Sequence, residues 1–126
     1  MDFLGRQYFI EFYDCDTNHL DDTEFIAKHM KEAARAANAT MVQQFFHQFS
    51  PYGVSGTIVI TESHLNIHTW PEHNYAAVDI FTCGETLEAD KAIEYLAFWL
   101  KAKNHEVFIR NRGEKKKINQ YKIPAS

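Results

Sequence analysis

The sequence from Thr57 to Cys83 reads TIVITESHLNIHTWPEHNYAAVDIFTC, and this stretch decides the fold class. Its first part, TIVITE, is a nearly continuous apolar run that predicts a buried strand. The next two parts, SHLNIHTW and YAAVDIFTC, alternate with the two-residue period of a β-strand. Three strands joined by such short links favour antiparallel pairing, because a parallel pair needs a long crossover.

More strands are predicted on both sides of this stretch. Aromatic and β-branched residues indicate strands at 6–15, 39–49 and 105–110. The segment SPYGVSG, residues 50–56, is rich in turn formers, and we expect Gly53, Ser55 and Gly56 to form a loop. The final segment GEKKKINQYKIPAS, residues 113–126, is expected to be a polar tail.

Two helices are predicted from helical spacing of apolar residues. The first covers 22–38, with Asp21 and Glu24 spaced like a capping box. The second is LEADKAIEYLAFWLKAK, residues 87–103, with Thr86 as its N-cap. The resulting order β-α-β-β-β-β-α-β predicts an α+β fold, a two-layer sandwich in which an antiparallel-rich sheet carries both helices on one face.

Composition restricts the class of protein. A chain of 126 residues with 45% hydrophobic and 24% charged residues is typical of a single soluble globular domain, residues 1–126. The net charge of -4 argues against a nucleic-acid partner, and no apolar run is long enough for a membrane span. Because no signal peptide is evident and the two cysteines, Cys15 and Cys83, lie far apart, we expect a reduced, cytoplasmic protein.

Strand parity constrains any site in SHLNIHTW. In a regular strand one face carries Ser63, Leu65, Ile67 and Thr69, and the other carries His64, Asn66, His68 and Trp70. Ser63 and His68 therefore do not meet along one regular strand. Either the chain turns or bulges between them, or His68 of a second copy reaches Ser63.

Ser63 is the hydroxyl that stands out, since a carboxylate precedes it and two histidines follow. A nucleophilic serine needs a base and stabilisation of an oxyanion. The Gly-x-Ser-x-Gly elbow of hydrolases is absent here, and GVSGT around Ser55 matches it only in part. A Ser-His-Asp triad is therefore not expected.

The stretch HQFSPYGVSGTIVITESHLNIHTWPEHNYAAVDIFTCG, residues 47–84, resembles the core of the short prokaryotic S-adenosylmethionine decarboxylases. The motifs that carry the resemblance are GVSG, ESHLxIHTWPE and FTCG, and LGRQYFIEFYDCD near the N-terminus extends it. These enzymes use no pyridoxal phosphate. They make a covalent pyruvoyl group from one of their own serines.

The resemblance implies a role for five residues. Ser63 would attack the carbonyl of Glu62, and elimination would then cut the chain into 1–62 and 63–126, the latter beginning with the pyruvoyl group. His68 would be the base of that elimination, and Ser55 would support processing. Cys83 would return a proton to the substrate carbon after carbon dioxide leaves. The pyruvoyl group would hold the substrate amine as a Schiff base and accept the electrons of the breaking bond.

Substrate contacts follow less directly from the residue types. Glu72 is a carboxylate acceptor suited to ribose hydroxyls, and Phe49 or Trp70 offers a stacking surface for adenine or a sulfonium charge. These residues favour S-adenosylmethionine, whose product is the aminopropyl donor for spermidine synthesis. A relative that decarboxylates arginine or ornithine, and a non-catalytic binding protein, are the alternatives.

Several residues have simpler interpretations. His64 is expected to be structural and Cys15 a small buried hydrophobe. The histidines at 64, 68 and 73 fit no standard zinc spacing, so no metal is expected. The opposite strand faces of Ser63 and His68 indicate an active site at the interface of a homodimer, which is expected to be a four-layer αββα assembly.

Overall fold

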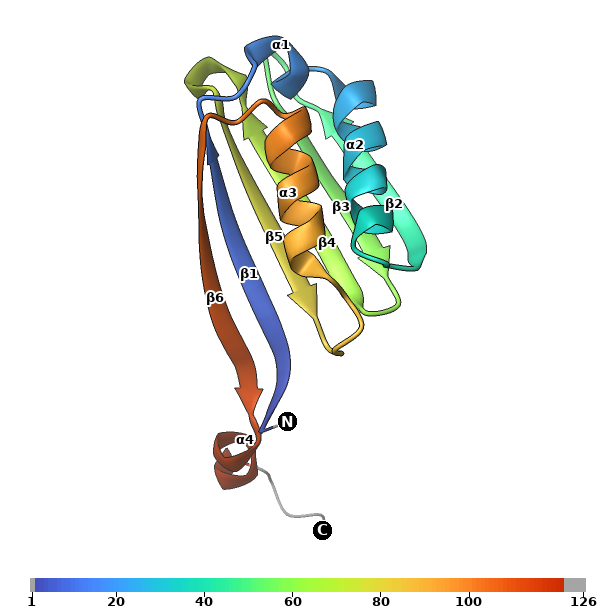
Figure 1. The fold of residues 1–126 in the computed structure, drawn as a ribbon, viewed down its shortest axis with the longest axis vertical. Helices are drawn as coiled ribbons and strands as arrows, with labels where there is room; N and C mark the ends of the chain where they lie inside the picture. The colour runs from blue at the N-terminus through green and yellow to red at the C-terminus, as the bar shows by residue number, and fades with distance from the viewer. Residues whose placement is uncertain (1, 122–126) are drawn as a thin grey trace.

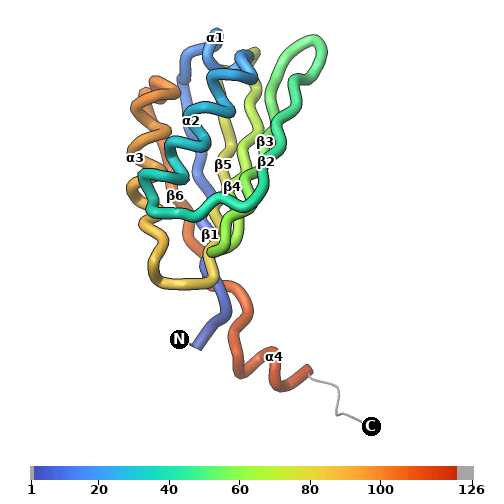
Figure 2. The backbone as a smooth tube through the Cα atoms, turned by 90° about the vertical axis from the view of Figure 1, so that its right-hand side faces the viewer, coloured from blue at the N-terminus to red at the C-terminus, as the bar shows by residue number. Residues whose placement is uncertain are grey.

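The computed structural model describes residues 2–121, and its centre is one six-stranded sheet in the order β2-β3-β4-β5-β1-β6. All of the neighbouring strands pair antiparallel. Two longer helices cover one face, as Figures 1 and 2 show from two directions. The predicted α+β class and the predicted order of the main elements are confirmed.

The strands begin and end close to the predicted positions. They are β1 Phe3–Tyr13, β2 Met41–Gln48, β3 Val54–Ile60, β4 Ser63–Trp70, β5 Tyr75–Thr82 and β6 Asn104–Glu114. The link between β3 and β4 is only Thr61 and Glu62, because Ile60 and Ser63 already pair across the hairpin. The predicted cleavage position, Glu62–Ser63, therefore lies at the tip of a tight hairpin.

Two longer helices, α2 Thr23–Ala36 and α3 Ala89–Trp99, form the second layer. Three shorter helical segments were not predicted. They are α1 Thr17–Leu20, the 3₁₀ turn η1 Pro71–His73 and α4 Lys115–Tyr121. The expected polar tail is thus helical as far as Tyr121, and its remainder lies outside the described residues. No helix among residues 2–121 is both long and apolar enough to span a bilayer.

The predicted cap of the first helix is shifted by one residue. Asp22, not Asp21, is the N-cap, and its side chain accepts a hydrogen bond from the Phe25 N–H at 3.1 Å. Asp21 instead accepts from the Gly53 N–H at 2.8 Å and thereby ties the β2–β3 loop to the helix start. Two consecutive aspartates offer the same chemistry, and only the tertiary contact with Gly53 separates their roles.

The predicted start of the second helix was also wrong. Glu88, not Thr86, is the N-cap of α3, and it makes no side-chain capping bond. Its backbone N–H donates to the carbonyl of Ala37 at 3.0 Å, so the segment before α3 is fixed to the end of α2. This long-range contact delays the start of the helix to Ala89.

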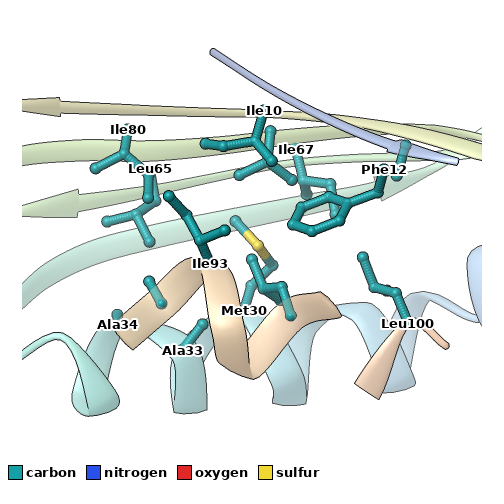
Figure 3. Packing of buried hydrophobic residues seen from close by; sticks show 14 of the residues in the cluster. Ile10, Phe12, Met30, Ala33, Ala34, Leu65, Ile67, Ile80, Ile93 and Leu100 are labelled. Carbon is teal, nitrogen blue, oxygen red and sulfur yellow. The ribbon is translucent and has the colours of Figure 1, made fainter. Parts of the chain in front are cut away.

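The core lies between the helices and the sheet. Strand residues such as Ile10, Leu65 and Ile80 meet Met30 and Ile93 of the helices (Figure 3). The opposite face of the sheet, called the open face below, has no helix from residues 2–121 over it (Figure 2). One row across it contains, in register, Phe45, Thr57, Asn66, Asp79, Phe9 and Phe108.

The core contact of Met30 predicts a measurable loss of stability. Met30 is fully buried, so Met30→Ala should lower the free energy of unfolding by about 2–5 kcal/mol. Denaturant titration followed by circular dichroism would measure this change. Lys28→Ala, on the exposed side of the same helix, is the matched control and should stay within about 0.5 kcal/mol. Equal effects of the two substitutions would contradict this packing.

Candidate active site

Strand β4 separates the predicted site residues into two groups. Leu65, Ile67 and Thr69 are buried under the helices, and His68 lies on the open face with its cross-strand partner Ser55. The register with β3 continues without a shift, so the proposed bulge between Ser63 and His68 is wrong. Five residues of strand place these two roughly 16 Å apart. We call the two regions the Ser63 end and the His68 end.

At the Ser63 end, the carbonyl oxygen of Glu62 accepts a hydrogen bond from the backbone N–H of Cys83 at 2.9 Å. Strand pairing creates this contact, since Ser63 lies opposite Thr82 at the end of β5. A backbone N–H aimed at a carbonyl oxygen stabilises negative charge that develops there during nucleophilic attack. The amide of Cys83 is therefore placed where an oxyanion donor would be needed, a contact that sequence patterns do not reveal.

The side chain of Glu62 is also held in place. Its Oε1 accepts from the backbone N–H of Thr40 at 3.3 Å. Desolvation alone would raise the pKa of the Glu62 carboxyl, but hydrogen bonds from Thr61, Thr40 and its own backbone outweigh this, and the pKa is lowered. Glu62 is thus an ionised, anchored residue immediately before Ser63.

Ser63 has a backbone φ of 156°, which differs from that of the residues that follow in the strand. Its Oγ lies 3.5 Å from Nδ1 of His64, the neighbouring residue on the open face. This position beside the hydroxyl allows His64 a chemical role in addition to the structural role expected from the sequence.

The His68 end brings together aromatic and hydroxyl side chains. The His68 ring lies 4.2 Å from the Trp70 ring and 5.5 Å from the Phe49 ring, between centroids. Ser55 pairs with His68 across the strands. Four of the predicted site residues, Ser55, His68, Phe49 and Trp70, are therefore adjacent in space although they come from two strands and a loop.

The predicted loop around Ser55 is wrong in part. Gly53 belongs to the loop, but Ser55 and Gly56 are inside β3. A side chain at Gly56 would clash, since its Cβ would lie 2.2 Å from Cδ1 of the Phe46 ring. This glycine therefore serves close packing with β2, and the turn-rich composition was misleading.

Glu72 lies in η1, directly after β4, and its side chain is exposed. Next to it, a shallow hollow of about 370 Å³ is lined by Glu11, Tyr13, Trp70, His73 and Tyr75. The rings of Trp70 and Tyr75 stack with centroids 5.3 Å apart. An aromatic wall with nearby carboxylates suits a cationic or heteroaromatic ligand.

The two cysteines lie in opposite environments, and the predicted burial of Cys15 is confirmed. Cys15 is buried in the core, and desolvation raises the pKa of its thiol to about 12. Cys83 is exposed at the end of β5, next to the Glu62 carbonyl. Of the two thiols, only that of Cys83 is accessible to a ligand.

Asp79 was not predicted as a site residue. It lies on the open face of β5, opposite Asn66. Desolvation raises the pKa of its carboxyl, and the nearby charge of His64 counteracts part of this rise. The signal in the sequence was a lone carboxylate in the otherwise uncharged strand YAAVDIFT.

Among residues 2–121, no three or more His, Cys, Asp or Glu side chains lie close enough together to hold a metal ion.

Comparison with known proteins identifies the family. Residues 6–113 match the family model for S-adenosylmethionine decarboxylase. A crystal structure of adenosylmethionine decarboxylase from Aquifex aeolicus superposes with a TM-score of 0.82 at 34% identity, covering 90% of this chain and 93% of that one. The chain belongs to the S-adenosylmethionine decarboxylase family, as its sequence motifs predicted.

Curated relatives extend this similarity over nearly the full length. The S-adenosylmethionine decarboxylase proenzyme of Thermotoga petrophila is 54% identical over 110 residues, 87% of this chain and 85% of the relative. That of Acidithiobacillus ferrooxidans is 55% identical over 122 residues, covering 97% and 90% of the two chains. The word proenzyme in both names states that these relatives are made as precursors.

Proposed function

We propose that the chain is a self-processing, pyruvoyl-dependent S-adenosylmethionine decarboxylase. It cuts itself between Glu62 and Ser63 into fragments 1–62 and 63–126, then releases carbon dioxide from S-adenosylmethionine. The product is the aminopropyl donor for spermidine synthesis. The observation that carries the proposal is the hydrogen bond from Cys83 N–H to the Glu62 carbonyl oxygen, 2.9 Å long, beside the Ser63 hydroxyl.

Processing takes place in two steps, an acyl shift and an elimination, followed by a hydrolysis. First, Ser63 Oγ bonds to the Glu62 carbonyl carbon, the Glu62–Ser63 amide bond breaks, and an ester with a free amine at Ser63 results. Second, His68 removes the proton on the Ser63 α-carbon, the bond between Cβ and Oγ of Ser63 breaks, and the α-carboxylate of Glu62 leaves. The dehydroalanine that remains takes up water and releases ammonia, which produces the pyruvoyl group. Ser55, beside His68, supports this process by hydrogen bonding.

The residues at the Ser63 end fit such a group. A serine follows a fixed carbonyl with a backbone donor, and the exposed Cys83 is next to it. When formed, the pyruvoyl group supplies an electron sink for decarboxylation. Cys83 holds the proton that is returned to the substrate carbon, a role suited to a thiol.

We infer that the complete site requires two copies of the chain. Within one chain His68 is roughly 16 Å from Ser63, too far for proton transfer. The open face carries large exposed apolar side chains, among them Phe45 at 69% and Phe108 at 54%. Two copies stacked through their open faces, with antiparallel β4 strands, would cover each other's exposed apolar side chains. This arrangement would bring the Ser63 end of each copy to the His68 end of the other. The assembly would have four layers, αββα.

Substrate recognition is assigned to the His68 end. Phe49 and Trp70 are exposed enough to stack on adenine, and Trp70 borders the aromatic hollow. Glu72 follows Trp70 closely enough to accept ribose hydroxyls at the same place. These contacts favour a nucleoside over arginine or ornithine, and the relatives named above carry no arginine or ornithine decarboxylase name.

Intact mass spectrometry of the denatured protein tests the proposal, together with release of carbon dioxide from S-adenosylmethionine, arginine and ornithine. We expect two fragments that meet at Glu62/Ser63, the second blocked to N-terminal sequencing, and release from S-adenosylmethionine alone. A chain that stays intact and is inactive on all three substrates would refute the proposal. Release from arginine or ornithine would keep the processing and replace the substrate.

A further inference from the structure

We propose that His64 is the base that takes the Ser63 hydroxyl proton in the first processing step, the transfer of the Glu62 acyl group from nitrogen to oxygen. The inference rests on the proposed function and deepens it. It gives a catalytic role to a histidine that the sequence motifs left without one.

The geometry selects His64 among the available bases. Its Nδ1 is 3.5 Å from Ser63 Oγ, a long contact that tightens with a small rotation of either side chain. His68 of the same chain is roughly 16 Å away, and the His68 that the proposed dimer brings to this end acts on the α-carbon proton in the second step. The Glu62 carboxylate is engaged by the Thr40 N–H. The first step removes a proton from Ser63 Oγ, and the second removes one from the Ser63 α-carbon. Each step therefore needs a base beside a different atom of Ser63.

The surroundings of His64 hold its ring and place a carboxylate near it. The ring stacks on Phe81, its partner on β5, with centroids 5.6 Å apart and planes inclined by 29°. Asp79 lies two residues before Phe81 on the same open face, close enough for its charge to act on His64. A carboxylate near an imidazole stabilises the imidazolium that forms when the proton arrives. Asp79 thus acts on His64 through its charge.

The step balances without a further reactant. His64 Nδ1 takes the proton from Oγ as the oxygen bonds to the Glu62 carbonyl carbon. Charge collects on the carbonyl oxygen, which already accepts from Cys83 N–H at 2.9 Å. The carbon–nitrogen bond then breaks, and His64 returns the proton to the leaving amine of Ser63. The products are an ester and a neutral base, ready for the elimination step.

Hydroxylamine distinguishes the two steps, because it splits an ester and leaves an amide intact. We expect His64→Ala to accumulate a full-length chain that hydroxylamine does not split, with cleavage about 100-fold slower or more. His68→Ala should instead accumulate a full-length chain that hydroxylamine splits after Glu62. Added imidazole should restore cleavage of His64→Ala. His105→Ala, at an exposed histidine on β6, is the matched control and should process like the unaltered chain.

Two results would overturn the role of His64. One is cleavage of His64→Ala at the normal rate, and the other is accumulation of a hydroxylamine-sensitive ester in that variant. If His64→Ala unfolds, His64→Gln retains the bulk and a hydrogen-bonding group, and the same two readouts apply to it. Failure of the proposed function looks different, since the unaltered chain itself would then never be cut.

Discussion

When Ser63→Ala and His68→Ala chains are produced together, only the His68→Ala chain should be cut. In a mixed dimer, one site combines an intact Ser63 end from the His68→Ala chain with an intact His68 end from its partner. The other site lacks both residues. Intact mass spectrometry, with a tag on one of the chains, would reveal which chain has been cleaved at Glu62/Ser63.

Each variant alone provides the control for this experiment, and neither should be cut. Dimers of each are expected to form, because neither substitution removes an apolar residue of the open face. Capture through the tag would establish that mixed dimers are present. If captured mixed dimers contain no cleaved chain, the shared site is wrong and the two residues must meet by some movement within one chain.

The sheet could be predicted from sequence because its signal is local. Alternation in SHLNIHTW reproduces the bounds of β4, Ser63–Trp70, without error. The same alternation assigned His68 and Ser63 to opposite faces. Local patterns were less informative where a distant contact decides, as with the cap at Asp22 and the strand position of Ser55. In both cases a contact with a residue distant in the sequence decides between two structures that the local sequence allows equally.

The sequence motifs supply residue types for the candidate site but not their arrangement. Motifs placed Ser63, His68 and Cys83 in roles, and family membership agrees with those motifs. They omit the backbone N–H of Cys83, because a motif describes side chains and every residue other than proline has a backbone N–H. They also omit Asp79, whose nearness to His64 depends on the register of β4 with β5. Pairing of strands, rather than any motif, creates these contacts.

The two contributions of Cys83 can be separated by one substitution. Its amide is the donor to the Glu62 carbonyl, whereas its thiol is the proposed proton donor in decarboxylation. Alanine retains the amide and removes the thiol, so Cys83→Ala should still be cut at Glu62/Ser63. Turnover of S-adenosylmethionine should fall by about 100-fold or more, because a positioned proton donor is lost.

Mass spectrometry of the cut fraction and release of carbon dioxide would measure the two effects on one sample. Cys15→Ala is the control, since that thiol is buried and its pKa is raised to about 12 by desolvation. It should leave both readouts unchanged even if stability declines. Iodoacetamide on the native, unaltered protein should likewise modify Cys83 and spare Cys15. A folded but uncut Cys83→Ala chain would mean that the thiol itself acts in cleavage, and full turnover by a cut Cys83→Ala chain would remove the thiol as the proton donor.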